Sequence, residues 1–375
     1  MKVLFLTEWY PHRYDAMAGL FVRKHAEAVA RQGVDVCVLY LHRDKQINQL
    51  EIVKQTTNGA LEIYVYYPKH YLYALYRGWQ EVKRHWGMPD VCQLNVITKN
   101  AILPLWLKIT RKTPYVIVEH WTGYLPISFT YKGFKHKRLA ELTARKSSVI
   151  LPVSEDLGNA MKLCGLRNKH WQVINNVVDD FFYTTQRRTS SKKRLLHISC
   201  FDEPHKNVCG ILRAVKQISL QRQDFDFVIV GTGTDFQQVY NYAQTLDFPA
   251  NMLVWTGEQT PQQVADWFST TDIFVLFSNT ENAPVVISEA LATGTPIISS
   301  AVGGIPEMIN KDCGILVSAS DETALTESIN HMLENLNEYN NSIIRQYGNK
   351  YRYDFVGQFL SQIYNNCLRL TDNPN

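Results

Sequence analysis

The chain has 375 residues, of which 45% are hydrophobic and 20% charged, a composition typical of a globular protein with room for two domains. The formal net charge of +4 argues neither for nor against a nucleic-acid partner, and we expect none. No run approaches 18 apolar residues, the length that a membrane-spanning helix requires. Because the apolar run at residues 3–6 is also too short for a signal-peptide core, we expect a cytoplasmic protein that at most lies on the inner face of the cell membrane.

The cysteines are scattered singly and show none of the paired spacings typical of metal ligands. They are Cys37, Cys92, Cys164, Cys200, Cys209, Cys313 and Cys367. We expect reduced and mostly buried thiols. No Asp-x-Asp element stands out as a set of ligands for a metal-bound diphosphate, so we expect neither a metal site nor a cofactor.

Apolar runs of strand length recur along the whole chain. In the first half they predict strands at residues 2–6, 34–40, 63–67, 115–118 and 149–153. In the second half they predict strands at residues 195–199, 227–230, 252–255, 273–277 and 297–300. A helix is predicted over residues 19–31, ended by Gly33. Such alternation predicts an α/β fold with parallel sheets covered by helices on both faces.

The pattern of apolar runs breaks near residues 179–194. Residues 184–194 are polar and basic, and we interpret them as a solvated linker rather than a binding patch. We therefore expect a first domain over residues 1–180 and a second over residues 181–352. Residues 353–370 predict an amphipathic helix at the end of the chain.

Residues 281–304 combine features that are typical of a ligand site. A predicted strand is followed by a polar loop over residues 278–282, and Pro284 suits the first position of a helix. Good helix formers continue to Thr293, and Gly294 stands where a glycine cap is expected. The N–H groups at the start of such a helix are unpaired and carry a partial positive charge, so they form an anion site.

Two carboxylates flank this predicted anion site. Glu289, in the first turns of the helix, can accept two hydrogen bonds in a fork that matches the vicinal hydroxyls of a ribose. Glu281, in the preceding loop, would reach a sugar on the other side of the phosphates. Either glutamate alone is more typical of a solvated helix end, but the pair indicates a ligand that carries both phosphate and sugar.

The spacing of Glu281 and Glu289, followed by Glu-Ala-Leu-Ala-Thr-Gly-Thr-Pro and later by Gly-Gly-Ile-Pro-Glu307, resembles the signature of the family-4 retaining glycosyltransferases. The resemblance implies the GT-B fold, in which two Rossmann-like domains with parallel sheets face a central cleft and the terminal helix, here residues 353–375, packs back onto the first domain. It implies that Glu289 holds the donor ribose, that Glu281 lies near the donor sugar, and that backbone groups of Asn282, Ala283, Pro284 and Val285 contact the sugar and diphosphate. Asn282 stands where the family usually has glycine.

The same resemblance assigns a cation to the diphosphate. Lys206, in the loop after the strand predicted at residues 195–199, matches the phosphate-binding lysine of the family. The family often has an arginine six residues earlier, where this chain has Cys200. A lysine at this place can neutralise the charge that develops on a leaving diphosphate.

Further positions match the family more weakly. Gly19, after the long loop that follows the first strand, would let backbone approach a phosphate or sugar. The turn at Gly231 resembles one that lines the nucleotide pocket, and Gly257 and Glu258 resemble the stretch whose backbone contacts the base. His120, at the end of the strand at residues 115–118, matches the cleft histidine that contacts the donor sugar. A lone histidine is otherwise more often structural.

Together these features predict a metal-independent retaining glycosyltransferase. The expected donor is a UDP- or GDP-sugar, the expected acceptor a carbohydrate or lipid-linked glycan, and the expected setting the assembly of a cell-surface polysaccharide. Two alternatives stay open: an isomerase or epimerase of nucleotide sugars with the same fold, and a non-catalytic nucleotide-sugar-binding subunit.

The sequence also offers residues for a membrane surface. Aromatic and basic residues alternate over residues 64–86, and basic residues are frequent over residues 131–146. Exposed together in the first domain, they would let the protein rest on anionic lipid and reach a lipid-linked sugar. An ordinary surface above buried rings is the alternative.

Overall fold

In the computed structural model, residues 1–126, 130–188 and 192–372 are described, and they form two compact units. The first unit contains residues Met1–Val177 together with Tyr353–Asn375, and the second contains Val178–Arg352. The division lies three residues before the expected boundary at residue 180, because Val178 already donates its backbone N–H to Tyr351 of the second unit.

The first unit is built on a mixed but mainly parallel sheet. Its strands are β1 (Lys2–Thr7), β2 (Asp35–Arg43), β3 (Glu51–Thr57), β4 (Ala60–Tyr67), β5 (Val91–Asn95), β6 (Tyr115–Glu119) and β7 (Val149–Pro152), in the order β3-β4-β2-β1-β5-β6-β7. The prediction of parallel pairing is wrong for β3, which runs antiparallel to β4 after a turn at Asn58 and Gly59. The apolar runs also do not predict β5, which lies next to β1 in the middle of the sheet.

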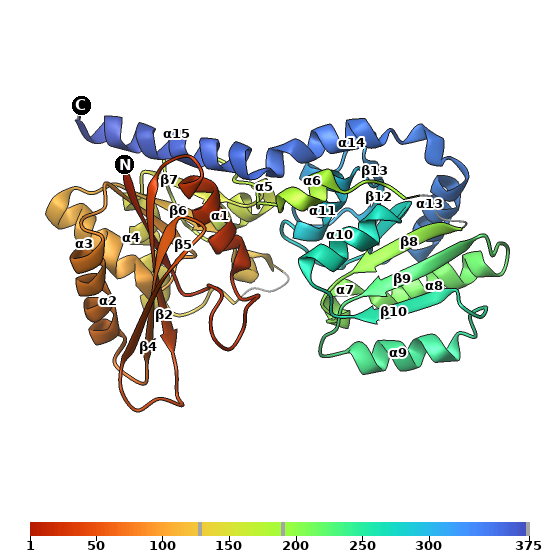
Figure 1. The fold of residues 1–375 in the computed structure, drawn as a ribbon, viewed down its shortest axis with the longest axis horizontal. Helices are drawn as coiled ribbons and strands as arrows, with labels where there is room; N and C mark the ends of the chain where they lie inside the picture. The colour runs from red at the N-terminus through yellow and green to blue at the C-terminus, as the bar shows by residue number, and fades with distance from the viewer. Residues whose placement is uncertain (127–129, 189–191, 373–375) are drawn as a thin grey trace. The chain divides into compact units, whose positions relative to one another are not determined.

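Helices cover both faces of this first sheet. They are α1 (Leu20–Ala30), α2 (Tyr71–His85), α3 (Ile102–Arg111), α4 (Phe134–Lys146), α5 (Glu155–Leu163) and α15 (Tyr353–Asp372). Figure 1 shows α2 and α3 on one side of the sheet and α1 on the other.

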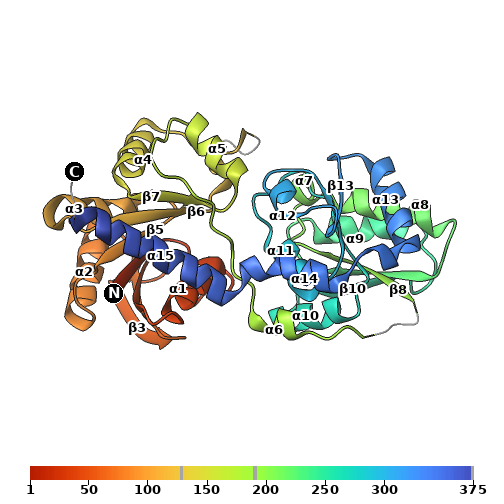
Figure 2. The same cartoon turned by 90° about the horizontal axis from the view of Figure 1, so that it is seen from above.

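The terminal helix α15 lies alongside α1, as Figure 2 shows from above. Gly357 allows this close packing, because a Cβ atom there would lie 2.2 Å from the backbone oxygen of Ala28. Farther along α15, the hydroxyl of Tyr364 donates to the side chain of Gln93 in β5. The end of the chain therefore completes the first unit.

The second unit has a sheet in which the described pairings are all parallel. Its strands are β8 (Lys193–Ile198), β9 (Phe225–Val230), β10 (Leu253–Gly257), β11 (Ile273–Leu276), β12 (Ile297–Ser300) and β13 (Gly314–Val317), in the order β10-β9-β8-β11-β12-β13. Successive residues of β9 enter opposite apolar layers, since Phe227 and Ile229 pack with one layer and Val228 and Val230 with the other.

Helices form the outer sides of these two layers. They are α6 (Asp180–Thr184), α7 (Glu203–Lys206), α8 (Val208–Ser219), α9 (Phe236–Thr245), α10 (Pro261–Ser269), α11 (Val285–Thr293), α12 (Ile305–Met308), α13 (Glu322–Glu334) and α14 (Asn341–Gly348). Buried residues of α8, α9 and α13 belong to one layer, and those of α10, α11 and α14 to the other. The second unit is thus a doubly wound sheet between two helical layers.

The basic run over residues 184–194 is only partly the solvated linker that its composition predicts. Residues 189–191 lie outside the described residues, but Lys193 and Arg194 begin β8. Arg194 donates from Nε and Nη2 to the two carboxylate oxygens of Asp226, at 2.8 Å each. Arg187 pairs with Asp272 at 2.8 Å. These arginines join neighbouring segments of the sheet, so a charged run at this place is structural.

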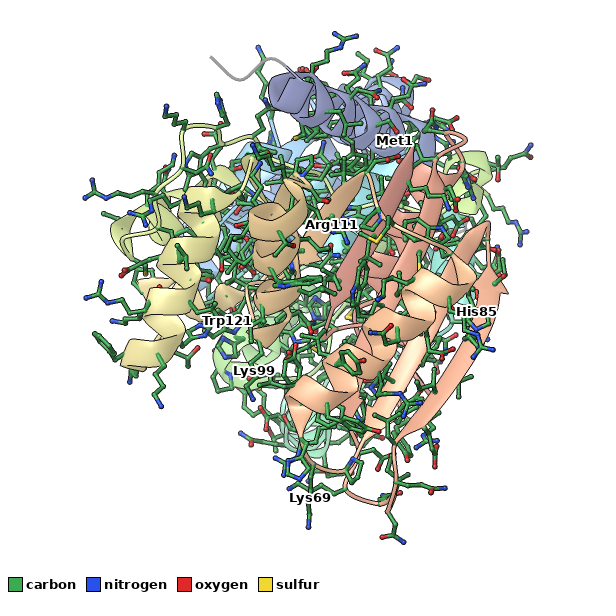
Figure 3. All side chains as sticks on the ribbon, turned by 90° about the vertical axis from the view of Figure 1, so that its left-hand side faces the viewer. Met1, Lys69, His85, Lys99, Arg111 and Trp121 are labelled. Carbon is green, nitrogen blue, oxygen red and sulfur yellow. The ribbon has the colours of Figure 1, made fainter. Side chains whose placement is uncertain are left out.

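The aromatic residues of the two predicted ranges, 64–86 and 131–146, are divided between buried and exposed positions. Tyr64, Tyr66 and Tyr131 are buried, whereas Tyr73 and Tyr76 on α2 are exposed. The neighbouring helix α3 adds apolar side chains that the prediction did not include, namely Trp106 and Ile109. Figure 3 shows α2 and α3 beside each other, between the labelled residues Lys69, His85, Lys99 and Arg111. An exposed apolar surface with basic ends is therefore formed by two helices.

Candidate active site

The order of strands in the second unit reverses between β8 and β11. β8 continues to β9 on one side, while β11 continues to β12 on the other. In open α/β sheets, ligands bind beyond the carboxyl ends of the strands at such a reversal. Lys206 follows β8 and Glu281 follows β11, so the topology places both predicted residues at this point.

Lys206 and Glu281 form an ion pair across the reversal. Their Nζ and Oε1 atoms are 2.6 Å apart, and the two side chains are 18% and 9% exposed. The hydroxyl of Ser278 donates to the same Oε1 at 2.8 Å. Ser278 is fully buried and orients the carboxylate. The sequence does not predict this role, because one serine at the end of a strand carries no distinctive signal.

The loops that carry Lys206 and Glu281 are also joined to each other. Nδ1 of His205 and Oγ1 of Thr280 are hydrogen-bonded at 2.6 Å. Asn279 donates its backbone N–H to the oxygen of His205 at 2.8 Å and its side-chain amide to the oxygen of Pro204 at 3.1 Å. These bonds hold the two loops in one arrangement, so the ion pair stands in a prebuilt site.

The loop after β8 contains a short helix, α7, that the sequence did not predict. Asn207 stands at the N-cap position of α8 but makes no side-chain capping bond there. Glu203 caps the start of α8 instead, because its carboxylate accepts from the backbone N–H groups of Val208 and Cys209 at 2.9 and 2.8 Å. A protein carboxylate therefore occupies the helix start in this loop, while Cys200 is exposed.

The helix α11 has the bounds that the sequence predicts, with one correction at its start. Pro284 is the N-cap residue with extended backbone, φ −66° and ψ 121°, and the first helical residue is Val285. Gly294 caps the end in the left-handed conformation, as predicted. Glu289 lies in the second turn of α11 and is partly exposed, as are Asn282 and Ala283 in the loop before it.

The turn after β12 supports the loop of Glu281. Gly303 has φ +54°, and a Cβ atom there would lie 1.9 Å from the backbone oxygen of Glu281. The next residue, Gly304, donates its N–H to the oxygen of Asn282 at 2.9 Å. The absence of a side chain at Gly303 is therefore what allows the loop to pass so closely.

The three glycines predicted to approach the donor differ in what surrounds them. A Cβ atom on Gly231 would lie 2.0 Å from the oxygen of Ser199, and one on Gly19 would lie 2.2 Å from the backbone of Trp9. Both glycines are thus explained by packing inside their own units. Gly257 has φ +69° and no atom within 4 Å of its Cβ position, and Glu258 beside it is exposed. Among these three, the structure leaves space for a ligand at Gly257.

His120 lies in the first unit, after β6, and its surroundings make it a neutral imidazole. Its ring is 4.0 Å from that of Phe21 and 5.7 Å from that of His25. Burial and the neighbouring His25 hold the pKa of His120 well below its usual value. An uncharged histidine can donate or accept a hydrogen bond but brings no positive charge to a ligand.

Glu119 fixes the backbone on which His120 stands. Its carboxylate accepts from the N–H groups of Ile97, His120 and Trp121, at 3.1, 3.0 and 2.9 Å. Glu119 is completely buried, and burial raises its pKa to about 7 despite these bonds. The sequence alone does not indicate this role of Glu119, since it depends on Ile97 from the neighbouring strand end.

The raised pKa of Glu119 predicts a measurable dependence of stability on pH. Because the pKa rises on folding, the group favours the folded state fully below its ordinary value of 4.5 and loses this contribution as pH increases through about 7. The difference between the thermal midpoints of the wild type and of Glu119→Gln should therefore decrease as the pH is raised from 5 to 8. Scanning calorimetry at several pH values would measure this difference. A difference between the two proteins that stays constant over this range would contradict the assignment.

One Asp-x-Asp triplet is present but lies away from the site. Asp226 lies at the amino end of β9 and pairs with Arg194. Asp224 directly precedes β9 and pairs with Arg222. In the described ranges, no group of three or more His, Cys, Asp or Glu side chains has an arrangement suited to a metal ion. Within the same part of the chain, none of the helices combines the length and hydropathy that crossing a bilayer requires.

Two family models match the chain. The model described as Glycosyltransferase Family 4 matches residues 18–180, and the model described as Glycosyl transferases group 1 matches residues 185–349. The first match falls almost entirely in the first unit and the second lies within the second unit. Lys206, Glu281 and Glu289 are all within the second match.

Relatives with curated descriptions match shorter stretches. The chain is 29% identical over 227 residues to N-acetyl-alpha-D-glucosaminyl L-malate synthase of Bacillus anthracis. This match covers 58% of this chain and 57% of that protein. It is 27% identical over 138 residues to GDP-mannose-dependent monoacylated alpha-(1-6)-phosphatidylinositol monomannoside mannosyltransferase of Corynebacterium glutamicum, which covers 35% of each chain. The matched region is therefore less than two thirds of the length of either relative.

Solved structures share the fold over nearly the whole chain. Sucrose-phosphate synthase from Thermosynechococcus elongatus has a TM-score of 0.76 at 15% identity, covering 98% of this chain and 99% of that one. HepE of Anabaena, in complex with UDP-glucose, has a TM-score of 0.70 at 16% identity, covering 98% and 100%. At these identities the likeness shows the fold alone, and it confirms the predicted GT-B class. With both family models placed along its length, the chain belongs to the family-4 glycosyltransferases of group 1.

Proposed function

We propose that the protein transfers a sugar from a nucleoside diphosphate sugar to a carbohydrate acceptor and retains the configuration at the anomeric carbon. The observation that carries this proposal is the Lys206–Glu281 ion pair at the strand reversal of the second unit. Complexes of HepE with UDP and with UDP-glucose support a nucleotide-sugar donor, and we propose a UDP- or GDP-sugar. The setting that we propose is the assembly of a cell-surface polysaccharide.

The proposal gives each site residue a role. Lys206 and the first N–H groups of α11 neutralise the leaving diphosphate without a metal ion. Glu289 binds the ribose hydroxyls, Glu281 faces the donor sugar, and Gly257 with Glu258 lies beside the base. In the first unit, His120 contacts the sugar as an uncharged hydrogen-bonding group. The residues whose backbone contacts the sugar and diphosphate are Asn282, Ala283, Pro284 and Val285. Gly19 and Gly231, which are surrounded by backbone of their own units, support the neighbouring loops rather than contact the donor.

The reaction is proposed to occur on one face of the donor sugar. The acceptor hydroxyl oxygen forms the new bond to the anomeric carbon while the bond from that carbon to the diphosphate oxygen breaks. The electron pair of the broken bond goes to the diphosphate, where Lys206 compensates the charge. The hydroxyl proton passes to the departing phosphate oxygen, so no protein base is required.

Donor binding tests this proposal directly. Ligand-observed NMR with UDP-, GDP-, ADP- and CDP-sugars is expected to show selective binding by the wild type, with Glu289→Ala weakening it about tenfold or more because two hydrogen bonds to the ribose are lost. Glu327→Ala, an exposed glutamate on α13, is the matched control and should bind normally. Binding and transfer should also survive EDTA. Equal binding by Glu289→Ala, or none by the wild type, would refute the proposed donor site.

We further propose that the acceptor is lipid-linked and that α2 and α3 rest on an anionic membrane. The exposed side chains of Tyr73, Tyr76, Trp106 and Ile109 form an apolar surface, with Arg77 bonded to Tyr73 on the same helix. Apolar side chains flanked by basic groups are typical of helices that lie in the membrane interface.

The double substitution Tyr76→Ser with Ile109→Ser is expected to reduce binding to phosphatidylglycerol-containing vesicles about tenfold, because two large apolar groups no longer enter the interface. Co-sedimentation would measure it. Leu220→Ser removes an exposed leucine from the second unit and should leave binding unchanged. If the double variant sediments with vesicles as the wild type does, the membrane contact is not on this surface.

A further inference from the structure

The turn after β5 contains a strained residue. Val96, which directly follows β5, has φ +62°, in the left-handed region that β-branched residues avoid. Val96 and the next residue, Ile97, are both buried. A backbone of this kind persists only where the surrounding structure imposes it, and it is typical of functional sites.

Two hydrogen bonds to β6 impose this backbone. The N–H of Val96 donates to the oxygen of Val118 at 2.8 Å, which continues the ladder between β5 and β6. The N–H of Ile97 then donates to Oε2 of Glu119 at 3.1 Å. The first bond is an ordinary sheet bond. The second ends on a side chain, so the strained turn depends on the protonation state of Glu119.

The two carboxylate oxygens of Glu119 hold two different turns. Oε2 accepts from Ile97 after β5, whereas Oε1 accepts from His120 and Trp121 after β6. A carboxylate suits these three N–H groups because both of its oxygens are acceptors, but a protonated carboxyl group carries an O–H donor. Oε2 is the less costly place for a proton, since one bond is lost there instead of two. The proton would then stand against the N–H of Ile97 and release the strained turn.

The titratable side chains that interact with Glu119 and His120 are uncharged at neutral pH. Tyr124 interacts with Glu119 from the segment after β6, and burial holds the pKa of this tyrosine well above its usual value. His25 on α1 lies beside His120, and burial lowers the pKa of His25 to about 4. On the side of β7, Glu119 pairs with Pro152. In the part of the chain that the structure describes, backbone N–H groups rather than a cation therefore stabilise the anionic Glu119.

We propose that Glu119 is a positioning residue for sugar transfer, whose ionised form holds the turns of Ile97 and His120 in the active arrangement. This inference rests on the proposed function, in which His120 contacts the donor sugar. When Glu119 takes up a proton, the turn at Val96 relaxes and the backbone of His120 loses the support that it shares with this turn. Both turns lie at the carboxyl ends of parallel strands, where ligands of such sheets bind.

The pH profile of transfer tests this role. The turnover number of the wild type is expected to rise about 30-fold from pH 5.5 to pH 8, which is the change in ionised fraction for a carboxyl group with a pKa of about 7. In Glu119→Gln, the amide nitrogen is a donor at every pH, so the turnover number should stay near the low-pH value of the wild type. His120 itself does not produce the rise, because burial holds its pKa well below 6.5. Binding of UDP to the second unit should be equal in both proteins.

Substitutions of Val96 separate this role from a general loss of structure. Val96→Gly removes the strain, because glycine adopts a positive φ without steric cost, so the turn no longer requires the charge of Glu119. Combined with Glu119→Gln, it should raise the turnover number at least about fivefold above that of Glu119→Gln alone. Val96→Ala is the matched control, since alanine also loses the valine methyl groups but keeps the Cβ atom that opposes a positive φ. Combined with Glu119→Gln, it should restore less, and thermal midpoints show that each variant is folded.

A measurement without substrate reports on the same turn. The imidazole signals of His120 in ¹H–¹³C NMR spectra, assigned by their absence in His120→Asn, should shift with a midpoint near pH 7 in the wild type and not in Glu119→Gln. A constant turnover number between pH 5.5 and pH 8, wild-type turnover in Glu119→Gln, or the same pH dependence of these signals in both proteins would overturn the proposal. If the wild type binds no nucleotide sugar, the proposed function fails, while the His120 signals still decide whether Glu119 controls this turn.

Discussion

Replacing Lys206 with alanine is expected to lower the turnover number for sugar transfer about 100- to 1000-fold, the loss typical of removing one group that stabilises transition-state charge. Lys206 lies 2.6 Å from Glu281. Without the lysine, Glu281 would stand unpaired beside the diphosphate and would repel it as negative charge develops. Steady-state kinetics with a labelled nucleotide sugar would measure the loss.

Two further variants separate this role from a general loss of structure. Lys311→Ala removes an exposed lysine elsewhere in the second unit and should leave transfer unchanged. The double variant Lys206→Ala with Glu281→Ala should lose less than the product of the single losses, because the two side chains share one interaction. A turnover number for Lys206→Ala close to that of the wild type would show that the diphosphate charge is compensated by another group.

Gly303→Ala is expected to abolish transfer, although the change adds one methyl group and no charge. The Cβ atom would lie 1.9 Å from the backbone oxygen of Glu281, and φ at this position is +54°. The loop must move to relieve the contact, which displaces the Glu281 carboxylate from Lys206 and Ser278. We expect transfer to fall at least about 100-fold and the free energy of unfolding to fall by about 2 kcal/mol or more.

The control for this substitution is Gly33→Ala. Gly33 also has a left-handed backbone, with φ +75°, but no atom lies within 4 Å of its Cβ position. Its substitution should cost stability through backbone strain alone and leave transfer intact. Thermal unfolding and transfer rates of both variants would separate the loss of stability from the loss of transfer. If Gly303→Ala transfers sugar at the wild-type rate, the turn after β12 does not position Glu281.

The sequence predicts the β11-α11-β12 region closely because its signals are local. The apolar run, the polar loop and the glycine cap stand in order along the chain, and the predicted helix differs from the observed one, Val285–Thr293, only in its first residue. In contrast, β5 was missed because Gln93 and Asn95 interrupt its apolar pattern. These polar side chains are buried and bond to each other, and Gln93 also accepts from Tyr364, more than 250 residues away. Such a partner is invisible in a local pattern.

The antiparallel edge strand β3 was missed for a different reason. Its residues are largely exposed, so burial imposes no apolar pattern on it. The sequence does contain a usable signal, since Asn58 and Gly59 form the tight turn to β4 with φ 48° and 85°. An Asn-Gly pair between two strands is the strongest short-range indication of a hairpin.

The candidate site was predictable only as separate residues. Lys206 and Glu281 were each found from their own motifs, but their contact follows from the neighbouring places of β8 and β11 in the sheet. Ser278 and Glu203 bond to groups only three to six residues away, but these bonds depend on the exact turn of each loop, so their residue types give no reason to select them. The second unit's long apolar runs determine the scaffold, whereas the bonds between the loop of Lys206 and the loop of Glu281 depend on tertiary structure.

The bonds between the loop of His205 and the loop of Thr280 have a consequence for engineering. A change of donor preference is often attempted by grafting one loop from a homologous enzyme. Here each loop supplies half of a shared set of hydrogen bonds, with Asn279 donating to both Pro204 and His205. A chimera that imports one loop alone leaves those donors and acceptors mismatched. The two segments form a single exchangeable module, and recombination would have to carry both together.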